Sequence, residues 1–267
     1  MESEQKALKS NNEWRLGIQA WTFRKFTFYE AVDKTASLGL NCIEGYPNQS
    51  ISSERPDVKF GHNMPAELRA EVKKKLADAK VKLVNYGVVP LSADEDECRK
   101  VFDFAKDMGI ETIVSEPPEE ALDLIEQLCK EYKIKLAIHN HPKPSHYWNP
   151  DKVLKACKGR SKWIGACADT GHFSRSGLEP VDMLRKLKGR IISLHFKDLN
   201  KLKDPDAHDV PWGTGKCRAK EMLAELKRQN FKGVFSIEYE YNWENSSPEI
   251  KKCIEFFNKT TNEFKGK

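Results

Sequence analysis

The sequence lacks the cysteine pattern of a disulfide-stabilised or zinc-finger protein. Its seven cysteines are an odd number, are widely spaced and include no C-x-x-C pair. Cysteines in such an arrangement are usually reduced and serve as small, buried apolar side chains. We therefore expect neither a disulfide framework nor a thiolate metal site. The arrangement also favours a reducing compartment, so we expect a cytoplasmic protein.

Long apolar runs are also absent. The first thirteen residues, MESEQKALKSNNE, are polar and contain no stretch that could form a signal-peptide core or span a membrane. We expect residues 1–13 to form a polar leader and residues 14–267 to form one catalytic domain. We expect no membrane association. A signal peptide that had already been removed would leave the same kind of sequence, so export stays open.

A concentrated basic patch is the third missing feature. The chain carries 45 basic and 40 acidic residues, a net charge of +5, and the basic ones are spread along segments such as AELRAEVKKKLADAK (66–80). Nucleic-acid-binding proteins usually gather their basic residues on one surface. We interpret these lysines and arginines as solvated helix faces and expect no nucleic-acid partner.

What the chain does contain is a regular alternation of short apolar segments and helical patterns. Eight segments resemble buried strands, and their first residues lie 24 to 43 positions apart. Strands that alternate with helices indicate a parallel sheet, and eight such units match a single-domain α/β fold, the (β/α)8 TIM barrel. The predicted strands cover 16–23, 42–47, 82–89, 111–117, 135–141, 165–172, 191–198 and 234–240.

Turn residues support this division. Four predicted helices run toward a glycine that can adopt the left-handed conformation at a helix end: Gly39, Gly109, Gly189 and Gly233. Long connections follow the second, fifth and seventh strands, over 48–65, 142–149 and 199–216. Because they follow strands, they lie at the C-terminal face, where barrel enzymes build their active sites.

Four of the predicted strands end in residues that can bind a metal ion. His139, Asp169, His195 and Glu238 occupy these ends. Alternate residues of a strand share a face, so His141 points the same way as His139, and Lys197 the same way as His195. Two imidazoles and two carboxylates suit one divalent Mn, Zn, Co, Ni or Fe ion.

Each of these residues has an ordinary alternative. A single strand histidine such as His195 is more often structural than a ligand, and Asp169 could equally cap a helix. Four successive strands with ligand residues at their ends are hard to obtain by chance. Together they favour a metal site.

Other side chains at this face have weaker claims. Glu116, at the end of the fourth strand, could transfer a proton. Trp21, Trp148 and Trp212 could stack on a sugar ring, although simple packing explains each equally well. Glu44 and His62 could bind hydroxyl groups or could be ordinary surface residues.

The motifs DTGH, LHFKD and IEYE resemble those of the xylose isomerase-like TIM-barrel superfamily of sugar phosphate isomerases and epimerases. The resemblance implies one divalent metal ion, with Asp169, His195 and Glu238 matching three of its four usual ligands. It also implies that His172 binds a substrate oxygen. The fifth strand departs from the pattern, because His139-Asn140-His141 stands where epimerases often have E-N-H.

This departure affects the expected chemistry. The epimerase mechanism, as the resemblance implies it, uses two metal-bound glutamates on opposite faces of the sugar, and a metal-bound imidazole is a poor base. We expect a sugar (phosphate) isomerase or epimerase-like enzyme that forms a metal-stabilised enediolate of a keto-sugar. Lys197 would stabilise the oxyanion, and Glu116, His141 and Glu238 are unranked candidates for the acid and base.

Three other functions stay open. A lyase or dehydratase of the same fold could carry out β-elimination on a keto-sugar or 3-keto-glycoside. An abasic-site endonuclease would need three metals and more ligands than the seven histidines here supply. A catalytically silent binding subunit would carry no metal. In the favoured case the partner is a small carbohydrate, and a homo-oligomer remains possible.

Overall fold

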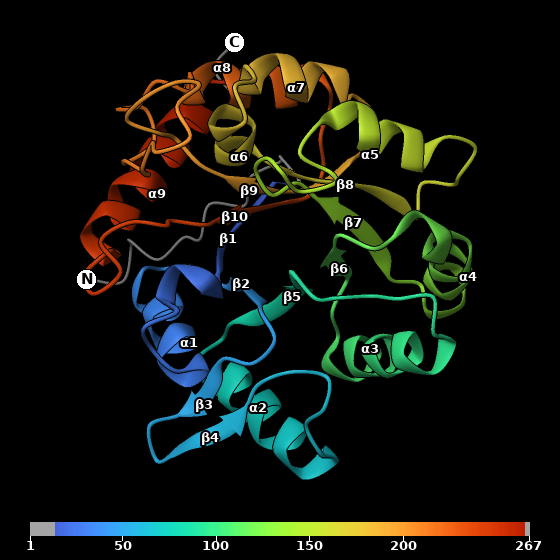
Figure 1. Ribbon diagram of the computed structural model, residues 1–267. Helices are drawn as coiled ribbons and strands as arrows, with labels where there is room; N and C mark the ends of the chain where they lie inside the picture. The colour runs from blue at the N-terminus through green and yellow to red at the C-terminus, as the bar shows by residue number, and fades with distance from the viewer. Residues whose placement is uncertain (1–13, 265–267) are drawn as a thin grey trace.

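The computed structural model describes residues 14–264, and the predicted polar leader lies outside this range. Eight parallel strands close into a barrel in the order β1-β10-β9-β8-β7-β6-β5-β2 (Figure 1). The predicted single-domain (β/α)8 barrel is therefore confirmed. The strands are β1 (Arg15–Gln19), β2 (Cys42–Gly45), β5 (Lys82–Tyr86), β6 (Thr112–Ser115), β7 (Lys135–His139), β8 (Ile164–Asp169), β9 (Ile191–Phe196) and β10 (Val234–Ile237).

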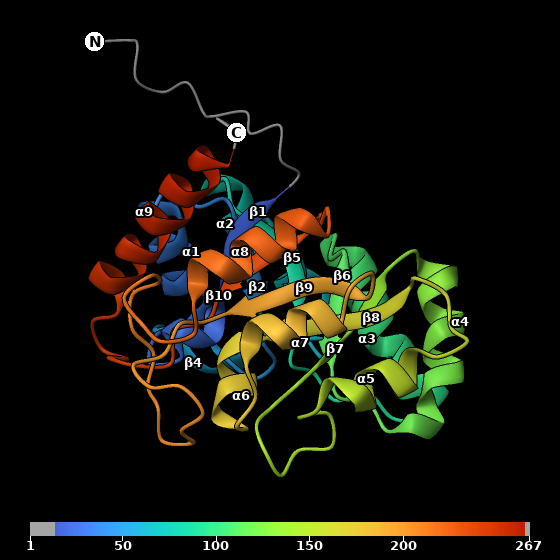
Figure 2. The same ribbon diagram turned by 90° about the horizontal axis from the view of Figure 1, so that it is seen from above.

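Helices surround the barrel on all sides (Figure 1). In the view from above, α7 and α8 lie along its outside next to β8 and β9 (Figure 2). The α-helices are α1 (Phe28–Ser37), α2 (Ala66–Asp78), α3 (Glu95–Met108), α4 (Leu122–Tyr132), α5 (Pro150–Cys157), α6 (Thr170–Arg175), α7 (Pro180–Lys186), α8 (Ala219–Arg228) and α9 (Ser247–Glu263), with short 3-10 helices η1 (Ala20–Phe23) and η2 (Glu119–Ala121).

Local sequence explains most helix ends. Gly39, Gly109 and Gly189 adopt φ angles of 76°, 72° and 77°, as predicted for left-handed residues at helix ends. Gly233 was predicted to do the same and does not, because α8 already ends at Arg228 and Asn230 makes the left-handed turn with φ 53°. Asparagine tolerates this conformation better than most residues.

Several elements were not predicted. The segment 16–23 was predicted as one strand, but β1 ends at Gln19 and the 3-10 helix η1 follows. The long connection after β2 contains an antiparallel hairpin, β3 (Ser50–Ser52) and β4 (Arg55–Lys59), which projects from the barrel beside α1 and α2 (Figure 1). The segment 165–172 was predicted as one strand, but it stops at Asp169 and continues as α6. Asp169 ends the strand because its side chain accepts a hydrogen bond from the backbone of the new helix.

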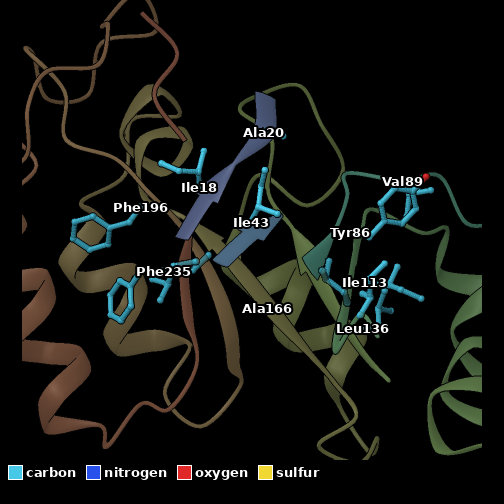
Figure 3. Close-up of a cluster of buried hydrophobic side chains, with 14 of the residues drawn as sticks. Ile18, Ala20, Ile43, Tyr86, Val89, Ile113, Leu136, Ala166, Phe196 and Phe235 are labelled. Atoms are coloured by element: carbon cyan, nitrogen blue, oxygen red, sulfur yellow. The ribbon is translucent and has the colours of Figure 1, made fainter. Parts of the chain in front are cut away.

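The main core lies between the strands and the helices. The labelled side chains of Figure 3 come from all eight barrel strands or the residues next to them and face this layer. Inside the barrel the residues are small: Cys42, Val84 and Val234 form one cluster, and Val114, Ala137 and Cys167 form another. The lower interior is therefore filled, and the ionisable side chains lie above it.

The cysteines and the helices bear on two expectations about the chain as a whole. All seven cysteines are free and buried, as predicted. Within residues 14–264, no helix combines the length and the apolar character that crossing a bilayer requires.

Candidate metal and substrate site

Asp169 connects the fold to the site. Its Oδ1 accepts a hydrogen bond of 2.7 Å from the backbone N–H of His172 and so caps α6. Its Oδ2 is buried and lies 2.8 Å from Lys197 Nζ. The two interpretations of Asp169 are thus compatible, because one oxygen serves as the helix cap and the other faces the site. The motif DTGH builds this arrangement within four residues.

Two histidines present unpartnered nitrogens to the same place. His139 Nε2 and His195 Nδ1 are buried without hydrogen-bond partners, at 3.6 and 3.9 Å from Asp169 Oδ2. The opposite ring nitrogen of each histidine contacts a carboxylate: His139 Nδ1 lies 3.1 Å from Glu116 Oε1, and His195 Nε2 lies 2.8 Å from Glu44 Oε1. Each ring is therefore fixed by a carboxylate at one nitrogen, and its other nitrogen, which points toward Asp169, makes no hydrogen bond.

Lys197 is the fixed cation of the site. Its side chain is fully buried, and its Nζ lies 2.8 Å from Asp169 Oδ2, 2.7 Å from Glu238 Oε2 and 2.8 Å from Glu240 Oε2. Gly171 makes room for it, because a Cβ at that position would lie 2.7 Å from Lys197 Cδ. The glycine of DTGH and the lysine of LHFKD therefore fit together through close contact.

The buried carboxylates are held in their charged form. Burial alone would raise the pKa of Asp169, but the charge of Lys197 and the contact with His139 help to hold that pKa well below its ordinary value. Burial would likewise raise the pKa of Glu238, and Lys197 and His195 lower it. Burial lowers the pKa of His172 to about 3, so this imidazole is neutral at physiological pH.

The cationic groups shift in the opposite direction. Burial would lower the pKa of Lys197, but Asp169, Glu238 and Glu240 raise it well above its ordinary value. Burial would also lower the pKa of His139, and its contacts with Asp169 and Glu116 raise it.

A second set of contacts lies at the edge of the site. Glu116 Oε1 is 2.6 Å from His141 Nδ1 and accepts a 2.7 Å hydrogen bond from the His141 backbone N–H. The Ser145 hydroxyl donates to Glu116 Oε2 at 2.5 Å. Burial would raise the pKa of Glu116, but the two histidines lower it. The His141 side chain is 48% exposed and is thus accessible to a substrate.

A pocket of about 670 Å³ opens over these residues. It is lined by both ionisable side chains and aromatic or apolar ones. Among the lining residues there is no lysine or arginine. They are Gln19, Trp21, Tyr46, Pro47, Gly87, Val88, Val89, Pro90, Glu116, His141, His172, Glu238 and Glu240.

The residues predicted for substrate binding are distributed unevenly. Trp21 and His172 line the pocket. His62 is half-buried, and its Nδ1 lies 3.0 Å from the Tyr86 hydroxyl oxygen. Lys143 Nζ lies 4.1 Å from the centre of the Trp148 ring. Neither His62 nor Trp148 lines the pocket.

Two predicted positions need correction. Trp212 is only 2% exposed and packs against Phe196, so it belongs to the core and cannot stack on a ligand. Glu44 is fully buried beneath the site, where His195 and three other residues occupy its oxygens, so it has no surface for a substrate hydroxyl.

The site also contains residues that sequence reasoning missed. Arg175 joins it to the loop after β9, with contacts of 2.7 Å to Glu240 and 2.8 Å to Asp209. Tyr46 packs edge-on against Trp21 at 5.0 Å and lines the pocket. An arginine three residues after His172 and a tyrosine just after β2 were the available signals.

Two observations fit a bound divalent cation. The first is the pair of buried ring nitrogens without hydrogen-bond partners, His139 Nε2 and His195 Nδ1, which converge on Asp169 Oδ2. The second is charge: the two fixed cations Lys197 and Arg175 contact four carboxylates, those of Asp169, Asp209, Glu238 and Glu240, while the ion pairs of Glu44 and Glu116 are with histidines. Buried charges require partners, and a metal ion would provide one.

The spatial groupings leave some freedom in the ligand set. Ligand atoms of His139, Asp169, His172 and Glu238 lie within 4.8 Å of one another, as do those of Glu116, His139 and His141. His195 Nδ1 reaches the same place, at 3.2 Å from Glu238 Oε2. The predicted set of His139, Asp169, His195 and Glu238 therefore stays a prediction.

The fold and the site define the class of this protein. It is a closed (β/α)8 barrel with a cluster of ionisable side chains at the C-terminal ends of its strands, the face where barrel enzymes have their active sites. The chain belongs to the xylose isomerase-like TIM barrel family, whose model matches residues 32–260. A search among curated proteins finds no match.

Solved structures with the same fold include one relatively similar protein. A putative uncharacterized protein from Parabacteroides distasonis is 36% identical, with a TM-score of 0.75 over 92% of this chain and 99% of that one. A D-psicose 3-epimerase studied with D-fructose is 14% identical, with a TM-score of 0.70 over 91% and 97% of the two chains. The probable 3-DHS dehydratase AsbF of Bacillus anthracis is also 14% identical, with a TM-score of 0.67 over 91% and 98%. The last two share the fold.

Proposed function

We propose that this protein is a divalent-metal-dependent carbohydrate enzyme of the isomerase or epimerase type, acting on a keto-sugar. One observation carries the proposal: His139 Nε2, Asp169 Oδ2 and His195 Nδ1 converge beside the pocket at the mouth of the barrel, and the two ring nitrogens are buried without hydrogen-bond partners. Unpartnered polar atoms are costly to bury, and a cation bound between these two ring nitrogens and the carboxylates beside them would give both nitrogens a partner.

His139, Asp169, His195 and Glu238 would hold one Mn, Zn, Co, Ni or Fe ion, since their nitrogen and oxygen donors suit these metals. When bound, such an ion supplies Lewis-acid polarisation of a carbonyl oxygen.

The chain's own residues supply the proton chemistry. Glu238 lines the pocket as a carboxylate and can accept a proton from a sugar carbon. Lys197 holds Glu238 in place at 2.7 Å. Glu116 and His141 also line the pocket and are 2.6 Å apart, so His141 can give or take a proton there. Neutral His172 would bind a substrate oxygen.

The lining of the pocket favours an uncharged sugar. A phosphate group requires cationic or N–H partners. The lining residues include no lysine or arginine, and the buried Lys197 and Arg175 already contact carboxylates. Trp21 and Tyr46 offer ring faces and edges of the kind that pack against sugar rings. We therefore favour an unphosphorylated substrate.

A lyase is the second candidate, and two features of the site favour it. The predicted ligand at the end of β7 is His139 rather than a carboxylate, which removes one base from a symmetrical two-base mechanism. His141 is half-exposed beside Glu116 and could protonate a departing group. The reaction would be β-elimination from a keto-sugar or 3-keto-glycoside.

Incubation of metal-loaded protein with unphosphorylated keto-sugars in deuterated buffer tests the proposal. An isomerase or epimerase incorporates solvent deuterium into a product of the same composition, whereas a lyase releases water or an aglycone. Mass spectrometry separates these results. Full activity in metal-free protein, or in Asp169→Ala, would contradict both functions.

A further inference from the structure

We infer that Glu44 is a positioning residue, which fixes the tautomer of His195 and thereby directs the lone pair of His195 Nδ1 toward the metal site. This inference rests on the proposed function, because it assigns a role relative to the proposed metal. The observation behind it is the hydrogen-bond network that surrounds Glu44 in the barrel interior.

Four donor groups converge on the Glu44 carboxylate. Oε1 lies 2.8 Å from His195 Nε2 and accepts from Gln19 Nε2 at 3.3 Å, while Oε2 accepts from Asn85 Nδ2 at 3.1 Å and from the Ser236 hydroxyl at 2.6 Å. These partners come from β1, β5, β9 and β10. Glu44 and His195 both have fully buried side chains, so water cannot replace a missing contact.

Only a carboxylate satisfies this arrangement. It carries no hydrogen and can accept from all four groups, whereas an amide would turn its NH₂ toward other donors. Because the carboxylate cannot donate, the proton shared with His195 belongs to His195 Nε2. A neutral His195 then has its lone pair on Nδ1.

The free nitrogen faces the proposed metal ligands. His195 Nδ1 has no hydrogen-bond partner and lies 3.2 Å from Glu238 Oε2 and 3.9 Å from Asp169 Oδ2. Metal-binding histidines usually donate their other N–H to a carboxylate or carbonyl group, which orients the ring and raises its basicity. Glu44 has the position and chemistry for this role, and it lies too deep to touch a substrate.

Titration of Co²⁺ into the wild-type and Glu44→Gln proteins tests the inference, with affinity measured by calorimetry and visible absorption. We expect Glu44→Gln to weaken Co²⁺ binding by about 10- to 100-fold. Glu225→Gln is the matched control, because Glu225 is also buried and hydrogen-bonded, to Arg228 and Gln229, but lies on α8 outside the barrel. We expect it to leave Co²⁺ affinity unchanged.

A double variant separates positioning from general stability. If Glu44 acts through His195, then Glu44→Gln has no further effect on Co²⁺ affinity in a His195→Ala background. A merely structural role would weaken binding to a similar extent in both backgrounds, and that result would overturn the inference. Unchanged affinity in Glu44→Gln alone would also overturn it while leaving the proposed function intact.

The tautomer of His195 can also be measured directly in the wild-type protein, so that the test does not depend on whether a variant folds. In Zn²⁺-loaded protein with ¹⁵N-labelled histidine, two-dimensional NMR should show a proton on His195 Nε2 and none on Nδ1. The opposite tautomer would overturn the inference. Failure of the wild-type protein to bind either metal would overturn the proposed function, and this inference with it.

Discussion

At the scale of the residue, the most informative side chain is Asp169, because its two oxygens have different tasks. Oδ1 caps α6 and Oδ2 faces the proposed metal. We expect Asp169→Asn to keep the helix cap, since asparagine caps as well as aspartate, but to lose metal binding. Asp169→Ala should lose both. Metal content by elemental analysis, together with thermal unfolding, distinguishes the two variants.

Lys197 carries a second prediction at this scale. Replacement by methionine leaves Asp169, Glu238 and Glu240 without their shared cation in a buried place. We expect Lys197→Met to lower the free energy of unfolding of chelator-treated protein by about 3 to 5 kcal/mol, as measured by urea denaturation. Lys201→Met, at a lysine that is 61% exposed, should change it little. A loss below about 1 kcal/mol in Lys197→Met would contradict this account.

Two tryptophans that look alike in the sequence should behave differently. Trp212 is buried against Phe196, so we expect Trp212→Ala to cost about 3 to 5 kcal/mol of stability. Trp21 lines the pocket, so Trp21→Ala should raise KM for the sugar with little effect on stability. Denaturant unfolding and steady-state kinetics on both variants check this. Equal stability losses would be inconsistent with the structure.

At the scale of the element, Glu126 joins α4 to the segment before β8. It accepts a 2.8 Å hydrogen bond from the Ser161 backbone N–H and lies 3.2 Å from Lys130 Nζ. Burial alone would raise the pKa of Glu126, but Ser161 and Lys130 lower it from 4.5 to about 2. A lowered pKa means that this carboxylate stabilises the fold above pH 4.5 and that its contribution disappears as the pH falls toward 2.

We therefore expect Glu126→Gln to destabilise the protein by about 1 to 3 kcal/mol at pH 7 and by much less near pH 2 to 3. Urea unfolding at several pH values measures the difference. Asp123→Asn provides the control, because Asp123 also lies on α4 but is 90% exposed, and its ion pair should contribute little. A deficit that persisted unchanged at low pH would contradict the assignment.

At the scale of the whole molecule, metal binding should stabilise the fold. A ligand that binds only the folded state adds about 2.7 kcal/mol at 100 times its Kd, which corresponds to about 5 to 10 °C in Tm for a protein of this size. We expect Mn²⁺ or Co²⁺ to raise the Tm of chelator-treated protein to this extent, as measured by differential scanning calorimetry. Asp169→Asn should show no such shift. An equal shift in that variant would indicate that the metal binds elsewhere.

Repeated local patterns made the architecture predictable. Most strands and helices follow from a short stretch of composition and its turn residues, and each of the eight barrel strands overlaps the segment predicted for it. The hairpin β3–β4 was missed because its strands are short and polar. The end of β8 was missed because the hydrogen bond that Asp169 accepts from the backbone of the next helix is a matter of conformation rather than composition.

The sequence by itself determined the fold and the kinds of side chain at the strand ends, because period and position within a strand set which face a residue takes. The tertiary structure decided their partners. It placed Glu44 under His195 and Trp212 in the core, and it brought Lys197 to three carboxylates from two other strands. These outcomes depend on closure of the barrel, which joins residues far apart in the chain: Glu44 and His195 are 151 positions apart, and Glu44 and Ser236 are 192 positions apart. No local pattern contains that information.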